Sequence, residues 1–513
     1  MKSYFSHQPL GQVRKIHFVL YSVAAFMFLY LRTFLLPGTP LVASGDETLY
    51  FTHGLRIMHG QVPFRDYFTY VMPGVDLFYA GAFGLFGVHA WLAQAFAILL
   101  GCAIAVVLVW ISRSVLSGPA IFLPGLLFLV LDFDIIKDAT HHWYSTLLVL
   151  SATGVLLGGR SIRRVLAVGI LCGLATLFTQ SQGMLSLITI AVYLWWTSHE
   201  DTLGLTKQMA ALVLPFAVIV SGFLGYFVYR VGFASLYYAL VTFVFLYFPA
   251  LKVHTTQAYL IQIPGHRALG DIARLFSYFF IHVFVPFGYL FCLFRLFREK
   301  TTMGRRLWEN VLLINLIGLA LFAAVANAPS FYRMCMVAPP ATIVCVWLVS
   351  GTGSAHRRMR GLLWVLAIVA MVALPFQLQR HWRGYIDLPN GRTAFLDPAL
   401  YEEFRWFAEK THASESFFNG PQLSFALSLD NPTTVDYVTQ TEYTTPEQVT
   451  AAIQGMEKHQ TPLVALYQHD YAPSPDLYAR GRTRSNLGPF LDYVYGNYHL
   501  AKVFPELQIW ERN

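Results

Sequence analysis

The sequence predicts an α-helical polytopic membrane protein that ends in a small mixed α/β domain. Of its 513 residues, 56% are hydrophobic and only 12% are charged, whereas an average soluble domain carries about 25% charged residues. A soluble core could not bury so large an apolar fraction. Long apolar segments alternate with short basic loops up to about residue 378, and polar residues dominate after it. We therefore expect a transmembrane domain over 1–378 and a soluble α/β domain over 379–513.

Apolar segments of membrane-crossing length predict about eleven transmembrane helices. A helix needs roughly 17 to 25 apolar residues for this purpose. The expected spans cover residues 18–36, 89–112, 117–133, 143–159, 165–180, 183–198, 208–229, 275–297, 307–327, 333–351 and 361–378. The count depends most on the short segments between 117 and 198. Arg32 lies near the outer end of the first span, where its long side chain is expected to reach the membrane interface.

The distribution of Lys and Arg predicts which side each loop faces, because cytoplasmic loops carry the excess of basic residues. Basic residues concentrate in alternate loops, at Lys2, Arg14, Lys15, Arg113, Arg160, Arg163, Arg164, Lys207, Arg295, Arg298, Lys300, Arg305, Arg306, Arg357, Arg358 and Arg360. With these loops inside, the N-terminus is cytoplasmic and the C-terminal domain lies outside. The net charge of +8 therefore orients the chain and does not predict a nucleic-acid partner.

Two long outer loops, 37–88 and 230–274, are expected between the spans. Residues 233–250 are apolar enough to cross the membrane, but a crossing would put the basic cluster at 295–306 outside. Their aromatic side chains suit a helix that lies in the outer membrane interface instead. Long loops of this kind are commonly functional.

The residues after 379 alternate between helix-like and strand-like patterns. Asp397 with Pro398 and Thr445 with Pro446 are start signals for two amphipathic helices. Strand-like runs follow at 462–467, 499–504 and 507–510, and the last two predict a hairpin.

Sequence motifs exclude several classes of enzyme. The five cysteines lie in apolar stretches without metal-ligand spacing, and no P-loop, HExxH or CxxC element occurs. An ATPase, a zinc protease and a redox enzyme are therefore not expected. No metal site is predicted, and a requirement for a divalent cation is left open.

The first outer loop carries the residues that most suggest chemistry. Charged residues follow the first span closely, in the order Asp46, Glu47, Arg56, Arg65 and Asp66, with Tyr50 among them. A carboxylate within hydrogen-bond reach of an acceptor hydroxyl can act as a general base. Asp46 could instead be a helix N-cap, and Arg56 and Arg65 could pair with Asp66 or Glu47 instead of contacting a substrate.

The order of residues in this loop resembles the GT-C superfamily of polytopic glycosyltransferases. That group includes protein O-mannosyltransferases, lipid A aminoarabinose transferases and RgtA/B/C/D-like enzymes. Its pattern is an acidic pair after the first span, then a tyrosine, a Gly–Pro–Asp element, a further proline and an apolar Leu-Phe-Gly. The matching residues are Asp46, Glu47, Tyr50, Gly60, Pro63, Phe64, Asp66, Pro73, Leu85, Phe86 and Gly87.

The chain departs from the family at the start of the fourth span. Many members carry an Arg-Pro-Asp-like motif there, whereas this sequence reads DFDIIKDATHHWYS over 132–145. Asp138 or the adjacent His141 and His142 could replace that motif in substrate binding, or the two histidines could be ordinary polar residues at a helix start. Neighbouring helical residues face different ways, so a shared metal ion is not expected. The segment looks more like the RgtA/B/C/D-like branch than a protein mannosyltransferase.

The resemblance implies an inverting glycosyltransferase that takes a sugar from a polyprenyl-phosphate donor. The acceptor would be a lipid, a glycan or a protein on the outer face of a bacterial-type plasma (inner) membrane. Asp46 is the expected catalytic base. Glu47 would orient it or bind the acceptor, because adjacent residues on a helix point about 100° apart.

A donor phosphate also needs a cation, and arginine suits it because it makes bidentate contacts. Arg333, beside Tyr332 at the outer end of a span, is the best placed, although it could be a mere interface anchor. Lys252 and Arg267 in the second outer loop are further candidates.

Two other classes of protein compete with this interpretation. A transporter or flippase of lipid-linked saccharides should show internal repeats and charges near the bilayer midplane, and we find neither in the sequence. A non-enzymatic membrane assembly protein, whose outer domain binds a partner, is opposed only by the first-loop pattern.

Overall fold

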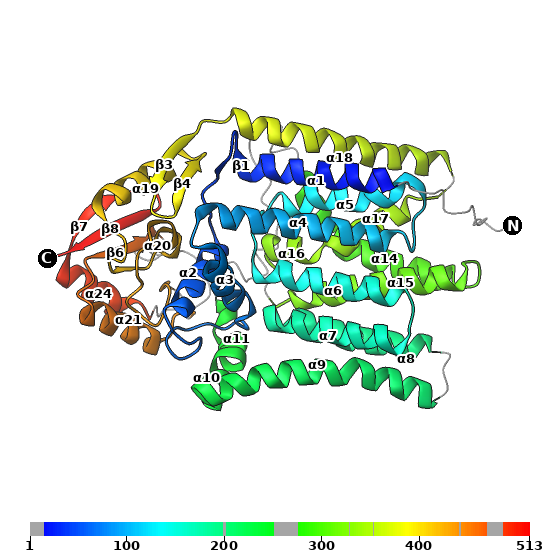
Figure 1. Cartoon of the computed structure of the whole chain (residues 1–513), viewed down its shortest axis with the longest axis horizontal. Coiled ribbons are helices and arrows are strands. Elements are labelled where there is room, and N and C mark those ends of the chain that lie inside the picture. The colour runs from blue at the N-terminus through cyan, green and yellow to red at the C-terminus, as the bar shows by residue number, and fades with distance from the viewer. Residues whose placement is uncertain are drawn as a thin grey trace. The chain divides into compact units, whose positions relative to one another are not determined.

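The computed structural model describes residues 15–198, 202–250, 275–327, 329–351, 353–440, 443–468 and 486–513 (Figure 1). Internal contacts divide the chain into two compact units. The helical unit comprises Met1–Thr33, Phe96–Leu224 and Thr256–Arg380, and the mixed unit comprises Phe34–Ala95, Gly225–Thr255 and His381–Asn513. The first expected outer loop and the start of the second therefore group with the C-terminal residues and not with the spans.

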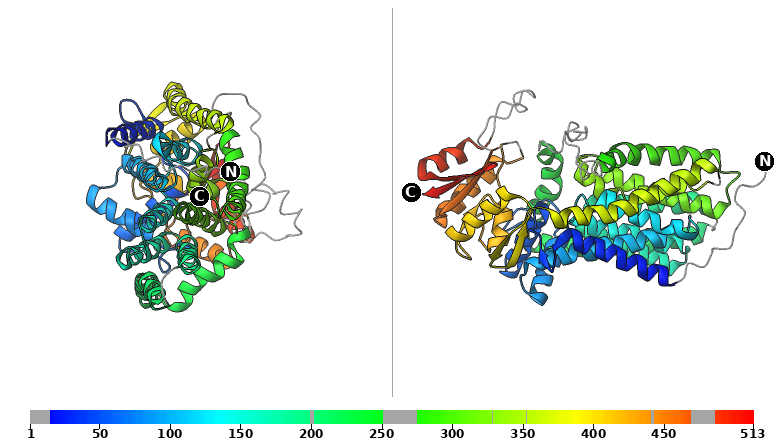
Figure 2. Two further views of the ribbon diagram at one scale, coloured as in Figure 1. Left: turned by 90° about the vertical axis from the view of Figure 1, so that its right-hand side faces the viewer. Right: turned by 90° about the horizontal axis from the view of Figure 1, so that it is seen from above.

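Apolar helices build the helical unit, and the long ones run side by side within it (Figures 1 and 2). In chain order they are α1 (Lys15–Thr33), α4 (Ala90–Ser112), η1 (Gly118–Phe122), α5 (Leu123–Leu127), η2 (Phe128–Phe133), α6 (His141–Leu157), α7 (Ile162–Phe178), α8 (Gln180–Thr197), α9 (Thr202–Val231), η6 (Phe280–Phe284), α14 (Val285–Arg298), α15 (Arg305–Ala324), α16 (Phe331–Val337), α17 (Pro339–Leu348) and α18 (Ser354–Arg380). The helix η2 is a π-helix, which widens the turn that carries Asp132.

The expectation of a multi-pass membrane protein is confirmed. Within the described ranges, seven helices are long and apolar enough to cross a membrane, or eight if α16 and α17, bent by 66° at their junction, count as one span. The expected spans at 117–133, 143–159, 165–180 and 183–198 coincide with η1 to η2, α6, α7 and α8, which fall short of that test. The total of about eleven spans therefore stays a prediction.

The apolar segment Phe233–Ala250 also has the length and apolarity of a span. It contains α10 (Phe233–Tyr237), η3 (Tyr238–Thr242), α11 (Phe243–Leu246) and η4 (Phe248–Ala250). It belongs to the mixed unit, where the ring of Phe243 lies 4.7 Å from that of Phe68 and 5.1 Å from that of Tyr443. That it lies in the outer interface and does not cross the membrane stays a prediction.

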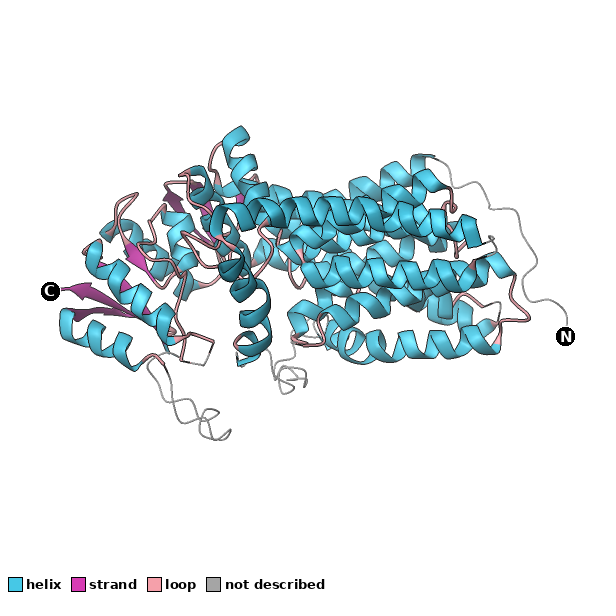
Figure 3. Cartoon of the chain, turned by 90° about the horizontal axis from the view of Figure 1, so that it is seen from below, coloured by secondary structure: helices cyan, strands magenta, loops and turns pink. Residues whose placement is uncertain are grey.

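The mixed unit carries the strands (Figure 3). Its remaining elements are β1 (Phe34–Leu35), β2 (Thr39–Pro40), α2 (Asp46–Met58), α3 (Gly74–Phe86), β3 (Gly384–Leu388), β4 (Gly391–Phe395), α19 (Pro398–Lys410), β5 (Phe417–Phe418), α20 (Pro421–Leu427), α21 (Pro446–Lys458), β6 (Leu463–Tyr467), α24 (Gly488–Asn497), β7 (Tyr498–Val503) and β8 (Leu507–Arg512). The three expected strands are confirmed as β6, β7 and β8. The two expected helices are confirmed as α19 and α21, with a full capping box at Thr445 and Gln448.

A four-stranded sheet with the order β5-β6-β8-β7 forms the centre of the C-terminal part. The strand β5 pairs with β6 in parallel, and the other pairs are antiparallel. The central strand β6 is buried on both faces, because Leu463 and Ala465 join a cluster with α19 and α20, while Val464 and Leu466 join one with α21 and α24. The edge strand β7 carries an irregularity in its pairing between Leu500 and Lys502.

The helices α2 and α3 pack closely because a glycine lies at their contact. A Cβ atom on Gly54 would lie 2.9 Å from the Cβ of Tyr79 and 3.1 Å from the backbone nitrogen of Ala80. Beside this contact, the rings of Phe51 and Tyr79 meet edge to face at 4.5 Å. The position of α2, which begins with the acidic pair, therefore depends on the absence of a side chain at residue 54.

We expect Gly54→Ala to lower the melting temperature of the purified full-length protein relative to Gly81→Ala. Both changes add one methyl group in a helix, but a Cβ at Gly81 meets nothing within 4 Å. Overpacking at Gly54 should cost about 1–3 kcal/mol, more than the gain in helix propensity of up to about 1 kcal/mol that both variants share. Equal melting temperatures of the two variants would contradict the close contact.

Candidate functional site

The acidic pair lies in the first turn of α2, at the start of the mixed unit's first long helix. The N-cap residue is Gly45, with a φ of 75°, so Asp46 is the first helical residue and not the N-cap. The Asp46 side chain is exposed, whereas Glu47 is only 3% exposed. The positive end of the helix dipole favours carboxylates at this position. The two neighbours therefore occupy different environments, and their separate tasks stay a prediction.

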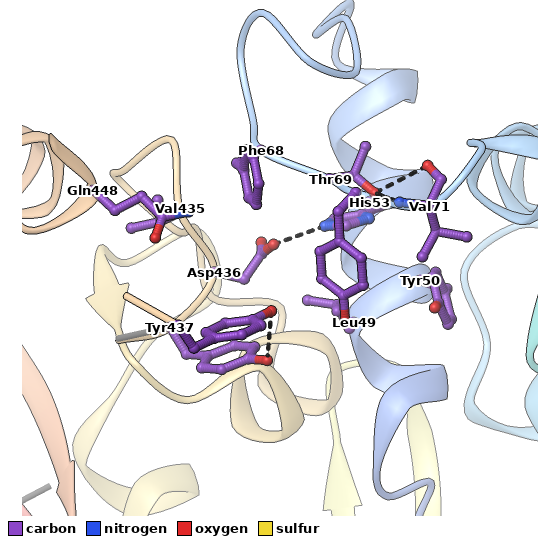
Figure 4. A pocket seen from close by; sticks show the side chains of 12 residues that line it. Leu49, Tyr50, His53, Phe68, Thr69, Val71, Val435, Asp436, Tyr437 and Gln448 are labelled. Carbon is purple, nitrogen blue, oxygen red and sulfur yellow. Dashed lines mark hydrogen bonds and ion pairs between the residues drawn. The ribbon is translucent and has the colours of Figure 1, made fainter. Parts of the chain in front are cut away.

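About two turns beyond the acidic pair on α2, a buried ionic cluster surrounds His53. Its Nδ1 lies 3.1 Å from Oδ2 of Asp76 on α3. Its Nε2 lies 2.9 Å from Oδ2 of Asp436, the contact that Figure 4 shows. The Tyr67 hydroxyl donates to the same Asp76 oxygen at 3.0 Å. Because only a protonated imidazole donates from both nitrogens, this geometry is that of the cation.

Two neighbouring carboxylates stabilise the protonated form of His53. Burial alone would lower the pKa of His53, but the charges and hydrogen bonds of Asp436 and Asp76 outweigh burial and raise it from 6.5 to about 9. A second cation, Arg56, lies 3.7 Å from Oδ1 of Asp436. Two buried cations therefore face two buried carboxylates, and the cluster is close to neutral overall.

The structure places Arg56 in this buried cluster, where protein atoms surround its guanidinium. It donates to Oε1 of Gln61 at 2.7 Å, to the Asp66 carbonyl at 2.9 Å and to the Thr433 carbonyl at 2.8 Å. Arg65 instead forms an exposed pair with the Asp66 carboxylate at 2.8 Å. Both arginines thus make structural contacts, which were the alternative to substrate binding, but Arg56 contacts the backbone carbonyl of Asp66 and not its carboxylate.

A pocket opens beside the His53 cluster, lined by residues of the mixed unit (Figure 4). Its aromatic side chains are Tyr50, Phe68, Tyr70, Tyr437 and Tyr443. Burial raises the pKa of the Tyr437 phenol well above its usual range, and Tyr70, Asp46 and Asp436 add to the effect. The charge of Asp46 therefore affects Tyr437, a residue of the pocket. Of the predicted site residues, Tyr50 lines the pocket.

The other predicted residues lie in the helical unit. His141 and His142 begin α6 and are buried, with their ring centroids 4.0 Å apart, and Nδ1 of His142 lies 3.3 Å from the Gln182 amide nitrogen. Arg333 on α16 interacts electrostatically with both histidines. The structure thus brings these three predicted residues together.

The remaining candidates are less closely connected. The neighbouring Tyr332 side chain is 53% exposed. Asp138 accepts a hydrogen bond of 3.1 Å from the Thr140 hydroxyl just before α6. Lys252 and Arg267 lie outside the described residues.

The structure gives Arg32 an ionic partner that the sequence did not reveal. Its guanidinium forms a bidentate pair with Asp134, at 2.6 and 2.9 Å, and also donates to the Leu374 carbonyl at 3.0 Å. Lys137 lies 3.7 Å from the same carboxylate. The partner Asp134 lies 102 residues away in the sequence, and the expected reach of Arg32 to the membrane interface stays a prediction.

Sequence reasoning missed the buried carboxylates and His53. Asp76 and His53 stand among apolar residues, which is a weak signal for a buried polar contact, but Asp436 lies 383 residues from His53. It also missed Asp132 on η2, whose two carboxylate oxygens are buried without a hydrogen-bond partner among the described residues. The described ranges contain no group of three or more His, Cys, Asp or Glu side chains placed to hold a metal ion.

The fold of the chain is similar to that of two solved structures. ArnT from Cupriavidus metallidurans, bound to undecaprenyl phosphate, has a TM-score of 0.53 and 14% sequence identity over 96% of this chain and 97% of its own. The archaeal oligosaccharyltransferase AglB from Archaeoglobus fulgidus, in complex with an inhibitory peptide and a dolichol-phosphate, has a TM-score of 0.50 and 13% identity over 88% of this chain and 69% of its own. No family model matches the sequence, and no curated protein is detectably similar to it in sequence.

We expect the folded state to lose stability as the pH rises from 6.5 to about 9. The pKa of His53 is higher in the folded chain than the 6.5 of an ordinary histidine, so its stabilisation is complete below pH 6.5 and is lost as the pH passes about 9. The loss should be on the order of 3 kcal/mol. The measurement is the melting temperature of the full-length protein at several pH values.

The variant His53→Gln isolates this contribution, since glutamine keeps a polar side chain but cannot be protonated. Its melting temperature should depend less on pH across this window than that of the wild type. Parallel pH profiles of the two proteins would show that His53 does not carry the expected charge.

Proposed function

We propose that the protein is an inverting glycosyltransferase, which moves a sugar from a polyprenyl-phosphate donor to a lipid, glycan or protein acceptor. The observation that carries the proposal is the acidic pair in the first turn of α2, in a chain whose fold matches ArnT over 96% of its length. The ArnT structure holds undecaprenyl phosphate, which is a carrier of the proposed donor class.

Asp46 is the proposed general base. The acceptor hydroxyl oxygen attacks the anomeric carbon of the donor sugar, and the bond from that carbon to the phosphate oxygen breaks. The proton of the hydroxyl passes to the Asp46 carboxylate, and the lipid phosphate leaves with the bonding electrons. The exposed position of Asp46 supports contact with an acceptor. Glu47, which is buried, is the residue proposed to orient Asp46 or to bind the acceptor.

Arg333 is the proposed ligand of the donor phosphate in the helical unit. A guanidinium gives bidentate hydrogen bonds to phosphate oxygens. The imidazoles of His141 and His142, which interact with Arg333, could donate further hydrogen bonds, and Tyr332 lies beside it on α16. Lys252 and Arg267 stay candidates for the same task.

The proposed location is the plasma (inner) membrane, with the N-terminus cytoplasmic and the C-terminal domain on the outer face. The alternation of basic loops supports this orientation. The acceptor would then be an outer-face molecule.

We expect Asp46→Asn to reduce sugar transfer about 10²- to 10⁴-fold, because the amide cannot accept the proton. The assay is transfer of radiolabel from polyprenyl-phosphate sugars in membranes that contain equal amounts of each variant. Asp387→Asn, which removes an exposed carboxylate from β3, is the matched control and should keep full activity.

The outcomes separate the competing classes. Equal transfer by wild type and Asp46→Asn would remove Asp46 from the mechanism. If the wild type transfers no sugar but moves lipid-linked saccharide across sealed vesicles, it is a flippase. If neither activity occurs, a membrane assembly protein is favoured.

We expect Arg333→Gln to raise the KM for the donor at least about tenfold, because a charge-assisted contact with phosphate contributes roughly 1.5–3 kcal/mol. Arg358→Gln, an exposed arginine on α18, controls for loss of positive charge. An unchanged donor KM in Arg333→Gln would identify Arg333 as an interface anchor.

A further inference from the structure

A buried glutamine of the helical unit holds one of the two histidines that begin α6. Gln182 lies in the first turn of α8 and is completely buried. Its amide nitrogen lies 3.3 Å from Nδ1 of His142. The ring of His142 also packs against that of His141, with centroids 4.0 Å apart. The imidazole of His142 is therefore fixed both at one nitrogen and against a neighbouring ring.

The position of Gln182 depends on the close packing of α7 and α8. A Cβ atom on the next residue, Gly183, would overlap with the side chain and backbone of Thr176 on α7 and would lie 2.7 Å from the carbonyl oxygen of Cys172. Only a glycine allows the two backbones to approach so closely. The first turn of α8 therefore lies directly against α7, which restricts the movement of the Gln182 backbone.

The two possible orientations of the Gln182 amide are not equivalent. With its nitrogen towards His142, the amide donates to Nδ1 and leaves one oxygen, Oε1, without a partner among the described residues. The reverse orientation would put the nitrogen, with its two N–H donors, at the position that offers no partner. Each unsatisfied buried group has its own desolvation cost, so two unpaired donors cost more than one unpaired acceptor. The amide of Gln182 therefore donates to His142.

This hydrogen bond determines which nitrogen of His142 carries the proton. Because Nδ1 accepts, the imidazole is neutral and its proton lies on Nε2. Within the described ranges Nε2 has no hydrogen-bond partner, and it is not among the unpaired polar atoms that are closed off from solvent. His142 as a whole is 6% exposed. The structure thus offers an accessible N–H donor of defined position.

The helix α16, which carries Arg333, packs against α6 on both sides of His142 along the chain. The Thr146 hydroxyl donates to the Met336 carbonyl at 2.8 Å, and the Thr140 hydroxyl lies 3.9 Å from the Met336 sulfur. Arg333 lies one turn before Met336 on α16 and interacts electrostatically with His142. Donors from two neighbouring helices therefore lie in one region, as the binding of an anion requires.

We propose that Gln182 is a positioning residue of the donor site, which holds His142 so that its Nε2–H donates to a phosphate oxygen of the donor beside Arg333. This inference rests on the proposed glycosyltransferase function, from which the class of donor is taken. A phosphate oxygen accepts from both the imidazole and the guanidinium, whereas a ligand that offers only donors would find no acceptor in this pair.

The test is binding of undecaprenyl phosphate and of dolichyl phosphate to the purified full-length protein in detergent. Gln182→Met keeps the approximate volume of the side chain but cannot donate a hydrogen bond. We expect it to weaken binding about threefold to tenfold, because the loss of one hydrogen bond lets the His142 ring rotate. Ser186→Ala, which changes another buried polar residue of α8, should bind like wild type. Undecaprenol, which lacks the phosphate, should not distinguish Gln182→Met from wild type.

A double-mutant cycle separates positioning of His142 from a general loss of structure. In the His142→Phe background, Gln182→Met should have no further effect on binding, because Gln182 acts through His142. If Gln182→Met does not fold, Gln182→Asn, whose amide is one methylene shorter, serves the same comparison. Equal weakening in both backgrounds, or unchanged binding by Gln182→Met, would refute the inference.

Binding and sugar transfer give separate answers. Binding that depends on Gln182 through His142, in a protein that transfers no sugar, would support a lipid-phosphate site and contradict the glycosyltransferase. Sugar transfer with a donor KM that is unaffected by Gln182→Met would support the enzyme and contradict the role of Gln182. If the wild type binds neither lipid phosphate, the inference is refuted whatever the transfer assay shows.

Discussion

The arrangement of the mixed unit depends on one buried interaction, the protonated imidazole of His53 between two carboxylates. Asp76 comes from α3 and Asp436 from a loop far along the chain, so the imidazole connects three segments. Removing one partner of a buried ion pair leaves an uncompensated charge and typically costs about 3–5 kcal/mol. Both His53 and Asp436 also line the pocket. A substitution at either residue therefore changes the shape of the pocket and the charge balance of the cluster together.

The parts of the fold that follow local rules could be predicted from the sequence. Long apolar helices such as α4 and α15 follow from length alone, and α21 follows from its capping box. The number of spans was harder, because α6 and α7 are only 17 residues long and α16 meets α17 at a bend of 66°. Such short or broken helices are stabilised by packing against neighbouring helices. A hydropathy pattern contains no information about this packing.

The residues of the candidate site also differ in how far the sequence could predict them. The acidic pair and Tyr50 could be found because they form a pattern within a few residues of one another. Asp436 could not, because 383 residues separate it from His53, and a single sequence carries no record of contacts across such distances. The ion pair between Arg32 and Asp134 was missed for the same reason, because 102 residues separate the two side chains. Local patterns identified candidate groups, whereas their pairing followed from the tertiary fold.

The irregular edge strand β7 has a consequence for how copies of the protein coexist in a membrane. An exposed sheet edge invites another strand to pair with it, and bulges and charged side chains oppose this. The interrupted pairing between Leu500 and Lys502, with a charged lysine on the strand, makes β7 a poor template, and the opposite edge, β5, is only two residues long. Proteins confined to two dimensions collide often, so this geometry favours a protein that stays dispersed at high density and does not polymerise through its sheets.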